Sequence, residues 1–313
     1  MTVATTVPLL DLKAQHETMR DEIASAIAEV VDSQWFIMGP NVSALEEEVA
    51  SYIGVKHAVG CGSGSDALLL ALMAVGVGHG DEVLCPSYTF FATAGAIYRL
   101  GAIPVFVDLD PTTYNICVDD TRTRAATCTN LKAIIPVHLF GQMLDMPKLQ
   151  QICSGQNIFI LEDAAQSVGA EFAGSQAGAY SDVAAYSFYP TKNLGGFGDG
   201  GMVTTNDEQL ANRMAKLRVH GGERRYYHSE VGVNSRLDAL QAAVLLIKLQ
   251  YLEAWHEGRA QNAAIYNDIF ELAGDIGLVS PKPPKSPARH IWNQFIIRVT
   301  SDRRDALREH LSE

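Results

Sequence analysis

Short apolar runs alternate with helical patterns through the middle of this chain. The runs are rich in Val, Ile and Ala and are bounded by Gly, Pro, Asn or Asp, which is typical of buried strands. Helices are predicted between them over 66–75 and 91–100. Alternation of this kind predicts an α/β fold with a mostly parallel sheet and helices on both of its faces. The predicted strands are 58–59, 82–85, 103–107, 133–137, 158–161, 184–188 and 201–205.

Further helices are predicted on the N-terminal side of this alternation. An amphipathic pattern predicts a helix over 14–31. Ser43 and Glu46 have the spacing of a capping box, which predicts that a second helix opens there and continues to about Tyr52, ending before Gly54. We assign these helices, together with the strands above, to a large domain over 1–240.

The remaining residues, 241–313, are interpreted as a smaller C-terminal α+β domain. A long helical pattern over 236–255 leads into it, and a helix over 260–272, a strand over 292–299 and a helix from Asp302 follow. The apolar run 295–299 needs partners in a sheet, yet only one predicted helix comes after it. We therefore expect this strand to be unusually exposed and the domain to be shortened.

Composition limits the possible partners and the compartment. The chain has 313 residues, of which 47% are hydrophobic and 19% charged, and its formal net charge is -12. These values are typical of a globular protein and argue against non-specific nucleic-acid binding. No export signal is predicted, and the longest apolar run, 67–78, is too short to cross a bilayer. The cysteines are odd in number and lack CxxC spacing, which favours a reducing cytoplasm over a disulfide framework or a metal site.

Two segments carry the strongest chemical signal. Asp163 follows the run 158–161 and so lies at the end of a strand, where α/β enzymes bind ligands. Lys192 comes about thirty residues later, between Thr191 and the glycine-rich stretch 195–201, which indicates a flexible loop. Pyridoxal phosphate (PLP) needs an acid that keeps its ring nitrogen protonated and an amine that bonds to its aldehyde. The pair therefore indicates a PLP enzyme in which Lys192 also acts as general acid and base.

The segment 60–66 joins a strand to a helix through a Gly-rich turn. Glycines there let backbone amides and a helix N-terminus approach a phosphate. A turn in which Ser65 simply caps the helix explains the pattern equally well. A dinucleotide-binding fold is disfavoured, because the third glycine is misplaced and no acid ends the following strand.

Other polar and aromatic residues are weaker candidates. Gln166, three residues after Asp163, could reach the cofactor's ring hydroxyl, and Ser187 could donate to its phosphate. Phe90 or Tyr88 could stack on the ring, although either could be a core aromatic. His138 is more typical of a buried structural histidine. The stretch 220–228 is the most basic in the chain, and it is either a cradle for a substrate diphosphate or a solvated loop.

Taken together, these segments resemble the DegT/DnrJ/EryC1/StrS family of PLP-dependent sugar aminotransferases, which have the type I (aspartate aminotransferase) fold. Six stretches carry the resemblance in the family's order along nearly the whole chain: 62–68, 86–93, 136–142, 162–167, 187–195 and 232–243. The family's relatives usually continue for several dozen residues beyond the helix that starts at Asp302.

The resemblance implies a role for each matching residue. Lys192 is the lysine that bonds covalently to PLP, Asp163 is the partner of the ring nitrogen, and Phe90 is the stacking aromatic. The remaining cofactor contacts that it implies are Gly64, Ser65, Asp66, Gln166, Ser187 and Asn234. Asn234 would reach the phosphate bound by a neighbouring subunit, which implies a homodimer with shared active sites.

The resemblance also implies a reaction. An amino group passes from glutamate or glutamine to a keto group of a sugar linked to a nucleoside diphosphate, for polysaccharide or lipopolysaccharide biosynthesis. Family members that dehydrate sugars carry histidine at the position of Lys192, so lysine favours transamination. Two alternatives stay open: a non-catalytic PLP-binding or regulatory protein of the same fold, and another type I PLP enzyme such as a lyase acting on amino acids.

Overall fold

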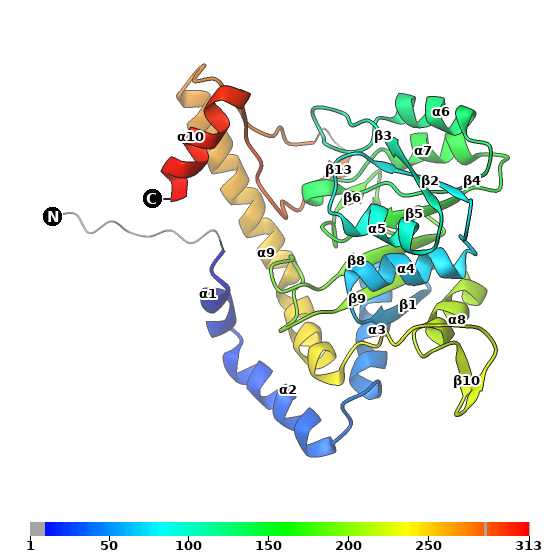
Figure 1. The fold of residues 1–313 in the computed structure, drawn as a ribbon. Helices are drawn as coiled ribbons and strands as arrows, with labels where there is room; N and C mark the ends of the chain where they lie inside the picture. Colours follow the sequence, from blue (N-terminus) through cyan, green and yellow to red (C-terminus); the bar gives the residue numbers. More distant parts are fainter. Residues whose placement is uncertain (1–9, 285–286, 313) are drawn as a thin grey trace.

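A seven-stranded mixed sheet forms the centre of the computed structural model, which describes residues 10–284 and 287–312 (Figure 1). The strand order is β1-β9-β8-β5-β4-β2-β3. Neighbours from β8 to β3 pair in parallel, whereas β9 runs antiparallel to both β1 and β8. The mostly parallel sheet predicted from the sequence is confirmed. The strands are β1 (His57–Cys61), β2 (Glu82–Pro86), β3 (Ile103–Val107), β4 (Leu131–Ile134), β5 (Phe159–Asp163), β8 (Val183–Ser187) and β9 (Gly201–Thr205).

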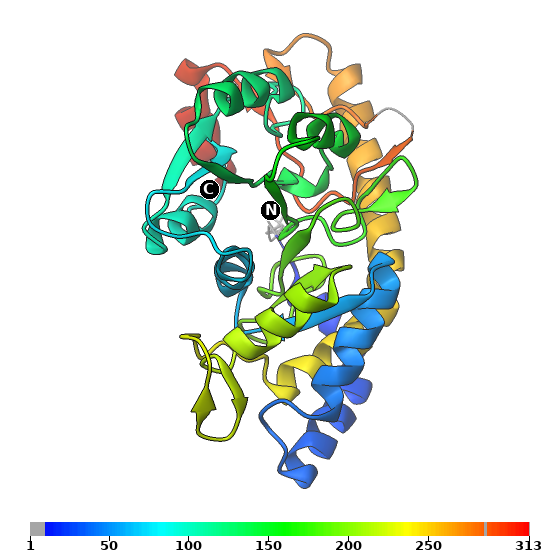
Figure 2. The same cartoon turned by 90° about the vertical axis from the view of Figure 1, so that its right-hand side faces the viewer.

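Each face of the sheet is covered by its own apolar cluster and its own helices (Figures 1 and 2). Side chains alternate between the faces along each strand, so Leu84 of β2 belongs to one cluster while Val83 and Cys85 belong to the other. The first cluster includes α3 (Pro40–Ile53), α6 (Val118–Thr127), α7 (Met146–Cys153) and α9 (Ala239–Leu272), and the second includes α4 (Gly64–Ala74), α5 (Ala92–Arg99) and α8 (Glu208–Leu217).

The N-terminal helices differ from the prediction in two places. The expected helix over 14–31 is divided into α1 (Leu12–Glu17) and α2 (Arg20–Ser33). Met19 breaks it, because this residue has non-helical backbone angles and its buried side chain packs with α9. Helix α3 begins at Pro40 and not at Ser43, since proline is well suited to the first helical position. It ends before Gly54, as predicted, where the chain turns left-handed.

Helix α9 is one continuous helix of 34 residues, whereas two helices over 236–255 and 260–272 were expected. It contains no proline, and a single glycine such as Gly258 costs a helix only about 1 kcal/mol. It packs along α2 and α3 and carries the chain from the sheet towards α10 (Ser301–Ser312) (Figure 1). Helix α10 confirms the helix predicted from Asp302.

The predicted strand over 292–299 is wrong in extent. Only β14 (Arg298–Val299) is a strand, and it pairs with β12 (Leu278–Val279). Upstream of it, the Ile291 amide donates to the Gly141 carbonyl at 3.0 Å. Phe295 packs against the rings of Tyr266 and Phe270 on α9. These contacts replace the missing sheet partners, so the residues 295–297 are half-buried and not unusually exposed.

Smaller elements complete the fold. A three-stranded sheet joins β6 (Glu171–Phe172), β7 (Ser175–Gln176) and β13 (Ala288–Arg289), and a short 3-10 helix covers Leu139–Gly141. The hairpin of β10 (Gly222–Arg224) and β11 (Tyr227–His228) projects from the body (Figure 2). All five cysteines are free. Over the described ranges, no helix is both long and apolar enough to cross a membrane.

Candidate active site

The carboxyl ends of four strands bring the predicted site residues to one edge of the sheet. β5 ends at Asp163 and β8 ends at Ser187. β1 leads into the turn before Gly64, and β2 leads into the segment that carries Phe90. These four strands point in the same direction, so their carboxyl ends meet at the same edge, where ligands bind in folds of this class.

Asp163 is a buried carboxylate with defined hydrogen-bond partners. Its residue is 5% exposed, the Thr93 hydroxyl donates to Oδ2 at 2.9 Å, and the Ala165 amide donates to Oδ1 at 3.2 Å. Burial raises the pKa of Asp163 above its usual value, and these two donors and the charge of Lys192 oppose that rise. These groups only partly offset the cost of burying the carboxylate, because the net shift of its pKa is still upward.

Thr93 is a site residue that the sequence reasoning missed. Its hydroxyl is fully buried and also lies 3.2 Å from the hydroxyl of Thr89. The available signal was a threonine near the start of the predicted helix 91–100, which is too common a feature to indicate a role. Its contact with Asp163 spans 70 positions, so no local sequence pattern could reveal it.

Lys192 is half-buried in the turn that follows β8. Its backbone amide donates to the Tyr189 carbonyl at 2.8 Å, which fixes the direction of the turn. Burial lowers the pKa of Lys192, while the charge of Asp163 acts to raise it. Strands β5 and β8 are neighbours, with Asp163 opposite Ala185, so Asp163 and the turn that carries Lys192 lie at the same edge of the sheet. The charge of each group acts on the pKa of the other.

The turn before α4 packs directly on the end of β8. A Cβ atom added to Gly64 would lie 2.6 Å from Cβ of Ser187, so only glycine allows this approach. The Ser63 hydroxyl accepts from the Asp66 amide at 3.1 Å and caps α4, so the interpretation that Ser65 caps the helix is wrong. Ser65 is exposed. The amides of Gly64 and Ser65 are the first of α4, and such amides have no acceptor within their own helix.

Asp66 and Asn234 have different surroundings. The Ser235 hydroxyl donates to Asp66 Oδ2 at 3.0 Å, and the Gly62 amide donates to the same hydroxyl oxygen at 3.0 Å. This chain of contacts joins the turn before α4 to the segment before α9. Asn234 is exposed. The predicted phosphate contacts of Asp66 and Asn234 stay predictions.

Phe90 and Tyr88, the two aromatic candidates for stacking on the cofactor ring, are both exposed. Phe90 is 73% exposed at the sheet edge, and Tyr88 is exposed as well, so neither is a core aromatic. Gln166 Oε1 accepts from the Phe140 amide at 2.7 Å, which leaves its Nε2 group as a hydrogen-bond donor.

In the basic stretch 220–228, the guanidinium of Arg224 lies 4.0 Å from the ring centre of Tyr227, and both side chains are exposed.

His138 forms a buried pair with Glu162. Its Nε2 donates to Glu162 Oε2 at 2.6 Å, because its Nδ1 accepts from the Leu144 amide at 3.3 Å. Burial would raise the pKa of Glu162, but hydrogen bonds from His138 and the Gly178 amide bring it below the usual value. The pair braces β5 one residue before Asp163, in agreement with the structural role predicted for His138.

The assembled groups fit PLP. The first amides of α4 suit a phosphate, the Ser187 hydroxyl accepts from the Tyr189 amide and keeps its proton to donate, and Lys192 supplies an amine. Asp163 is a buried anion that a protonated ring nitrogen would neutralise.

Comparisons with known proteins agree with this arrangement. The model of the DegT/DnrJ/EryC1/StrS aminotransferase family matches residues 17–313. A relative from Geobacillus stearothermophilus, described as a pleiotropic regulatory protein, is 48% identical over 98% of this chain and 81% of its own length. A dTDP-3-amino-3,4,6-trideoxy-alpha-D-glucose transaminase from Streptomyces venezuelae is 45% identical over 97% of this chain and 79% of its own length. Among solved structures, S. venezuelae DesV in complex with a ketimine intermediate superposes with a TM-score of 0.92 at 43% identity, covering 98% of this chain and 81% of DesV.

Proposed function

This chain belongs to the DegT/DnrJ/EryC1/StrS aminotransferase family, and from that premise we propose which of its residues carry the reaction. It is a PLP-dependent aminotransferase of the type I fold whose acceptor is a keto sugar linked to a nucleoside diphosphate. The observation that carries the assignment of roles is that Asp163 ends β5 while Lys192 follows the neighbouring strand β8, so both lie at one edge of the sheet.

Asp163 and Lys192 have complementary tasks in this proposal. When bound, PLP supplies an electron sink that acidifies the carbon bearing the amine. Asp163, held by Thr93 and Ala165, keeps a proton on the ring nitrogen. Lys192 bonds covalently to the cofactor and, once released by substrate, moves a proton at its Nζ as general base and acid. Burial lowers the pKa of Lys192, which increases the fraction of free amine available for both steps.

The surrounding residues hold the cofactor in place. The amides of Gly64 and Ser65 and the hydroxyl of Ser187 bind the phosphate. Phe90 covers one face of the ring, and the Nε2 group of Gln166 donates to the ring hydroxyl. Asp66 contributes to the phosphate side by fixing the turn before α4.

Several features of the assembly belong to the same proposal. Glutamate or glutamine is the amino donor, and two chains form a homodimer in which Asn234 reaches the partner's phosphate. Exposed aromatic side chains at Phe90, Phe91 and Tyr98 support an interface beside the site. We place the domain division at 240/241, within the first turn of α9, and the enzyme in the cytoplasm, where its free cysteines stay reduced. Its product would enter polysaccharide or lipopolysaccharide biosynthesis.

The test is a half-reaction without sugar. The protein loaded with PLP is mixed with glutamate, and conversion of the cofactor to its amine form is followed by absorbance. We expect conversion by the native chain and none by Lys192→Ala. Retained turnover in Lys192→Ala would refute the role of this lysine.

A second candidate function is regulatory PLP binding without catalysis, because one relative is described as a pleiotropic regulatory protein. The same assay separates the two functions. A chain that binds PLP at Lys192 but leaves it unconverted with every amino donor would favour the regulatory function. Conversion by glutamate, followed by transfer to a nucleotide-linked keto sugar, would favour the aminotransferase.

A further inference from the structure

Lys248 is a buried lysine that the functions above do not use. It lies in the first third of α9, is 4% exposed, and its Nζ donates to the carbonyl of Gly195. No ion pair in the described part of the chain includes Lys248. Burying an ammonium group without a carboxylate is costly, and burial lowers the pKa of Lys248 to about 8. Because burying this charge lowers the stability of the fold, we look for a role of Lys248 other than stabilisation.

Gly195 belongs to the loop that carries Lys192, three residues further along. The Gly196 amide donates to the Phe188 carbonyl at 2.7 Å, which closes the loop around Lys192. A Cβ atom at Gly195 would lie 2.4 Å from the Pro190 carbonyl oxygen. The glycines at 195 and 196 are buried, so they serve close packing and not the flexible loop expected from the sequence.

Gln241 is a second contact between α9 and the same loop. Its Oε1 accepts from the Phe197 amide at 2.7 Å, two residues after the carbonyl that Lys248 holds. Seven residues make about two turns of helix, so Gln241 and Lys248 lie on one face of α9. A Cβ atom at Gly196 would lie 2.7 Å from Gln241 Oε1, which shows how closely the helix and the loop meet.

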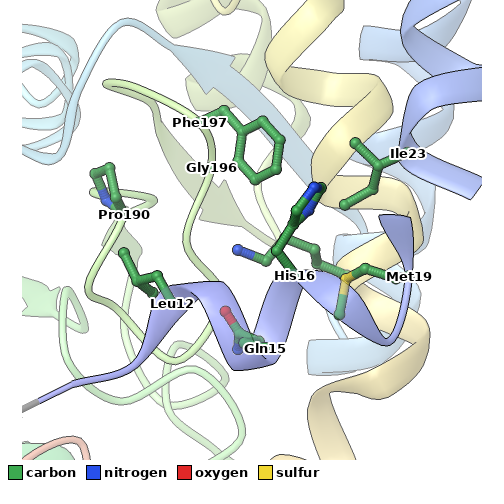
Figure 3. A pocket seen from close by; sticks show the side chains of 9 residues that line it. Leu12, Gln15, His16, Met19, Ile23, Pro190, Gly196 and Phe197 are labelled. Atoms are coloured by element: carbon green, nitrogen blue, oxygen red, sulfur yellow. The ribbon is translucent and has the colours of Figure 1, made fainter. Parts of the chain in front are cut away.

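The pocket beside Lys248 has a volume of about 300 Å³ and is lined mostly by apolar side chains, together with Gln15 and His16 of α1. Figure 3 shows His16 and Phe197 close to each other in its wall. Lys248 Nζ lies 5.6 Å from the ring centre of Phe197 and 6.0 Å from that of Trp255. The rings offset part of the cost of burial. Among the described residues, the hydrogen-bond acceptor of the Lys248 ammonium is the Gly195 carbonyl.

We propose that Gln241 and Lys248 are positioning residues for Lys192, holding the carbonyl of residue 195 and the amide of residue 197 so that the loop presents the reactive amine towards Asp163. This inference rests on the proposed function of Lys192. It assigns to α9 the task of fixing the active-site lysine. A methyl group or a thioether at position 248 would pack in the same space, but it would leave the Gly195 carbonyl without its donor.

The test compares the variants Lys248→Met and Gln241→Leu with the native chain. Lys132→Met is the matched control. Lys132 lies on β4, away from α9, and its ammonium also lies over an aromatic ring, that of Phe159. Two quantities are measured: hydrogen exchange of the Gly196 and Phe197 amides in the cofactor-free protein, and the rate at which added PLP becomes attached to Lys192. Thermal unfolding of the cofactor-free protein is recorded alongside.

We expect Lys248→Met and Gln241→Leu to speed amide exchange and to slow PLP attachment about tenfold or more. In Lys132→Met, both rates should stay within about threefold of the native values. Lys248→Met should unfold at the same or a higher temperature, because its buried charge is gone. Native-like exchange and attachment in both variants would overturn the proposal, as would slowing that only follows loss of folded protein. If the native chain itself attaches no PLP at Lys192, the proposed function fails, whereas the exchange measurement still tests the hold of α9 on the loop.

Discussion

Replacing Thr93 by valine tests how the site keeps Asp163 ionised. The two side chains have nearly the same shape, so Thr93→Val removes one hydroxyl without opening a cavity. The hydroxyl donates to Asp163 Oδ2 at 2.9 Å, and both residues are buried, so water cannot replace the lost donor. The variant therefore changes the electrostatics of Asp163 more than the packing around it.

The size of the effect follows from the charge on the acceptor. A hydrogen bond to a charged group contributes about 1.5–3 kcal/mol, and 1.36 kcal/mol corresponds to one pKa unit, so Thr93→Val should raise the Asp163 pKa by about 1 to 2. Burial already raises this pKa, and the Thr93 donor opposes that rise. The unfolding free energy should fall by a similar amount at pH values above the Asp163 pKa, and this difference should shrink as pH falls through it.

The assay is the pH dependence of the half-reaction with glutamate. Ionised Asp163 is needed to hold the proton on the ring nitrogen, so the acidic limb of the rate profile should move up by about 1 to 2 pH units in Thr93→Val. Thr121→Val is the matched control, because Thr121 is equally buried but donates to the Cys117 carbonyl within α6. An unmoved acidic limb in Thr93→Val, or an equal displacement in Thr121→Val, would refute the reasoning.

Three other substitutions test separate parts of the account. Gly64→Ala places a Cβ atom 2.6 Å from Cβ of Ser187, and such overpacking costs about 1–3 kcal/mol. PLP binding should therefore weaken about tenfold, and an equilibrium titration with unchanged affinity would contradict this. His138→Phe leaves Glu162 buried without its strongest donor, so urea denaturation at pH 7 should show about 3–5 kcal/mol less stability. A loss well below about 1 kcal/mol would argue against a buried, ionised Glu162. Lys248→Met should be more stable than the native chain at pH 7. Its advantage should diminish as pH rises from about 8 towards 10.5, because folded Lys248 loses its proton before the unfolded chain does; thermal unfolding that shows a constant difference over this range would count against the lowered pKa.

Residues at strand ends were the ones that the sequence could place. The apolar runs before Asp163 and Ser187 identified two parallel strands, and parallel strands put their carboxyl ends at the same edge. Lys192 followed from its setting after the second strand. The family resemblance, now confirmed, supplied the cofactor and the reaction that these positions alone could only suggest.

Contacts between distant segments were out of reach of sequence patterns. Thr93 meets Asp163 across 70 positions, and Lys248 meets Gly195 across 53, so neither pair forms a local motif. One of the two interpretations of the Gly-rich turn gave the cap of α4 to Ser65, but it belongs to Ser63, because two serines so close together are equivalent until the helix start is known. The predicted strand 292–299 is mostly irregular, because packing against α9 satisfied its apolar side chains without a sheet.

Locating the bond between the chain and PLP tests the central claim most directly. The protein is loaded with PLP, treated with borohydride to make the linkage permanent, digested and analysed by mass spectrometry. The account predicts a pyridoxyl phosphate adduct on the peptide containing Lys192 and none in Lys192→Ala. The informative rival is Lys248, the other lysine of the described chain whose pKa is lowered by burial. An adduct on Lys248 or elsewhere in place of Lys192, or no adduct at all, would contradict the account.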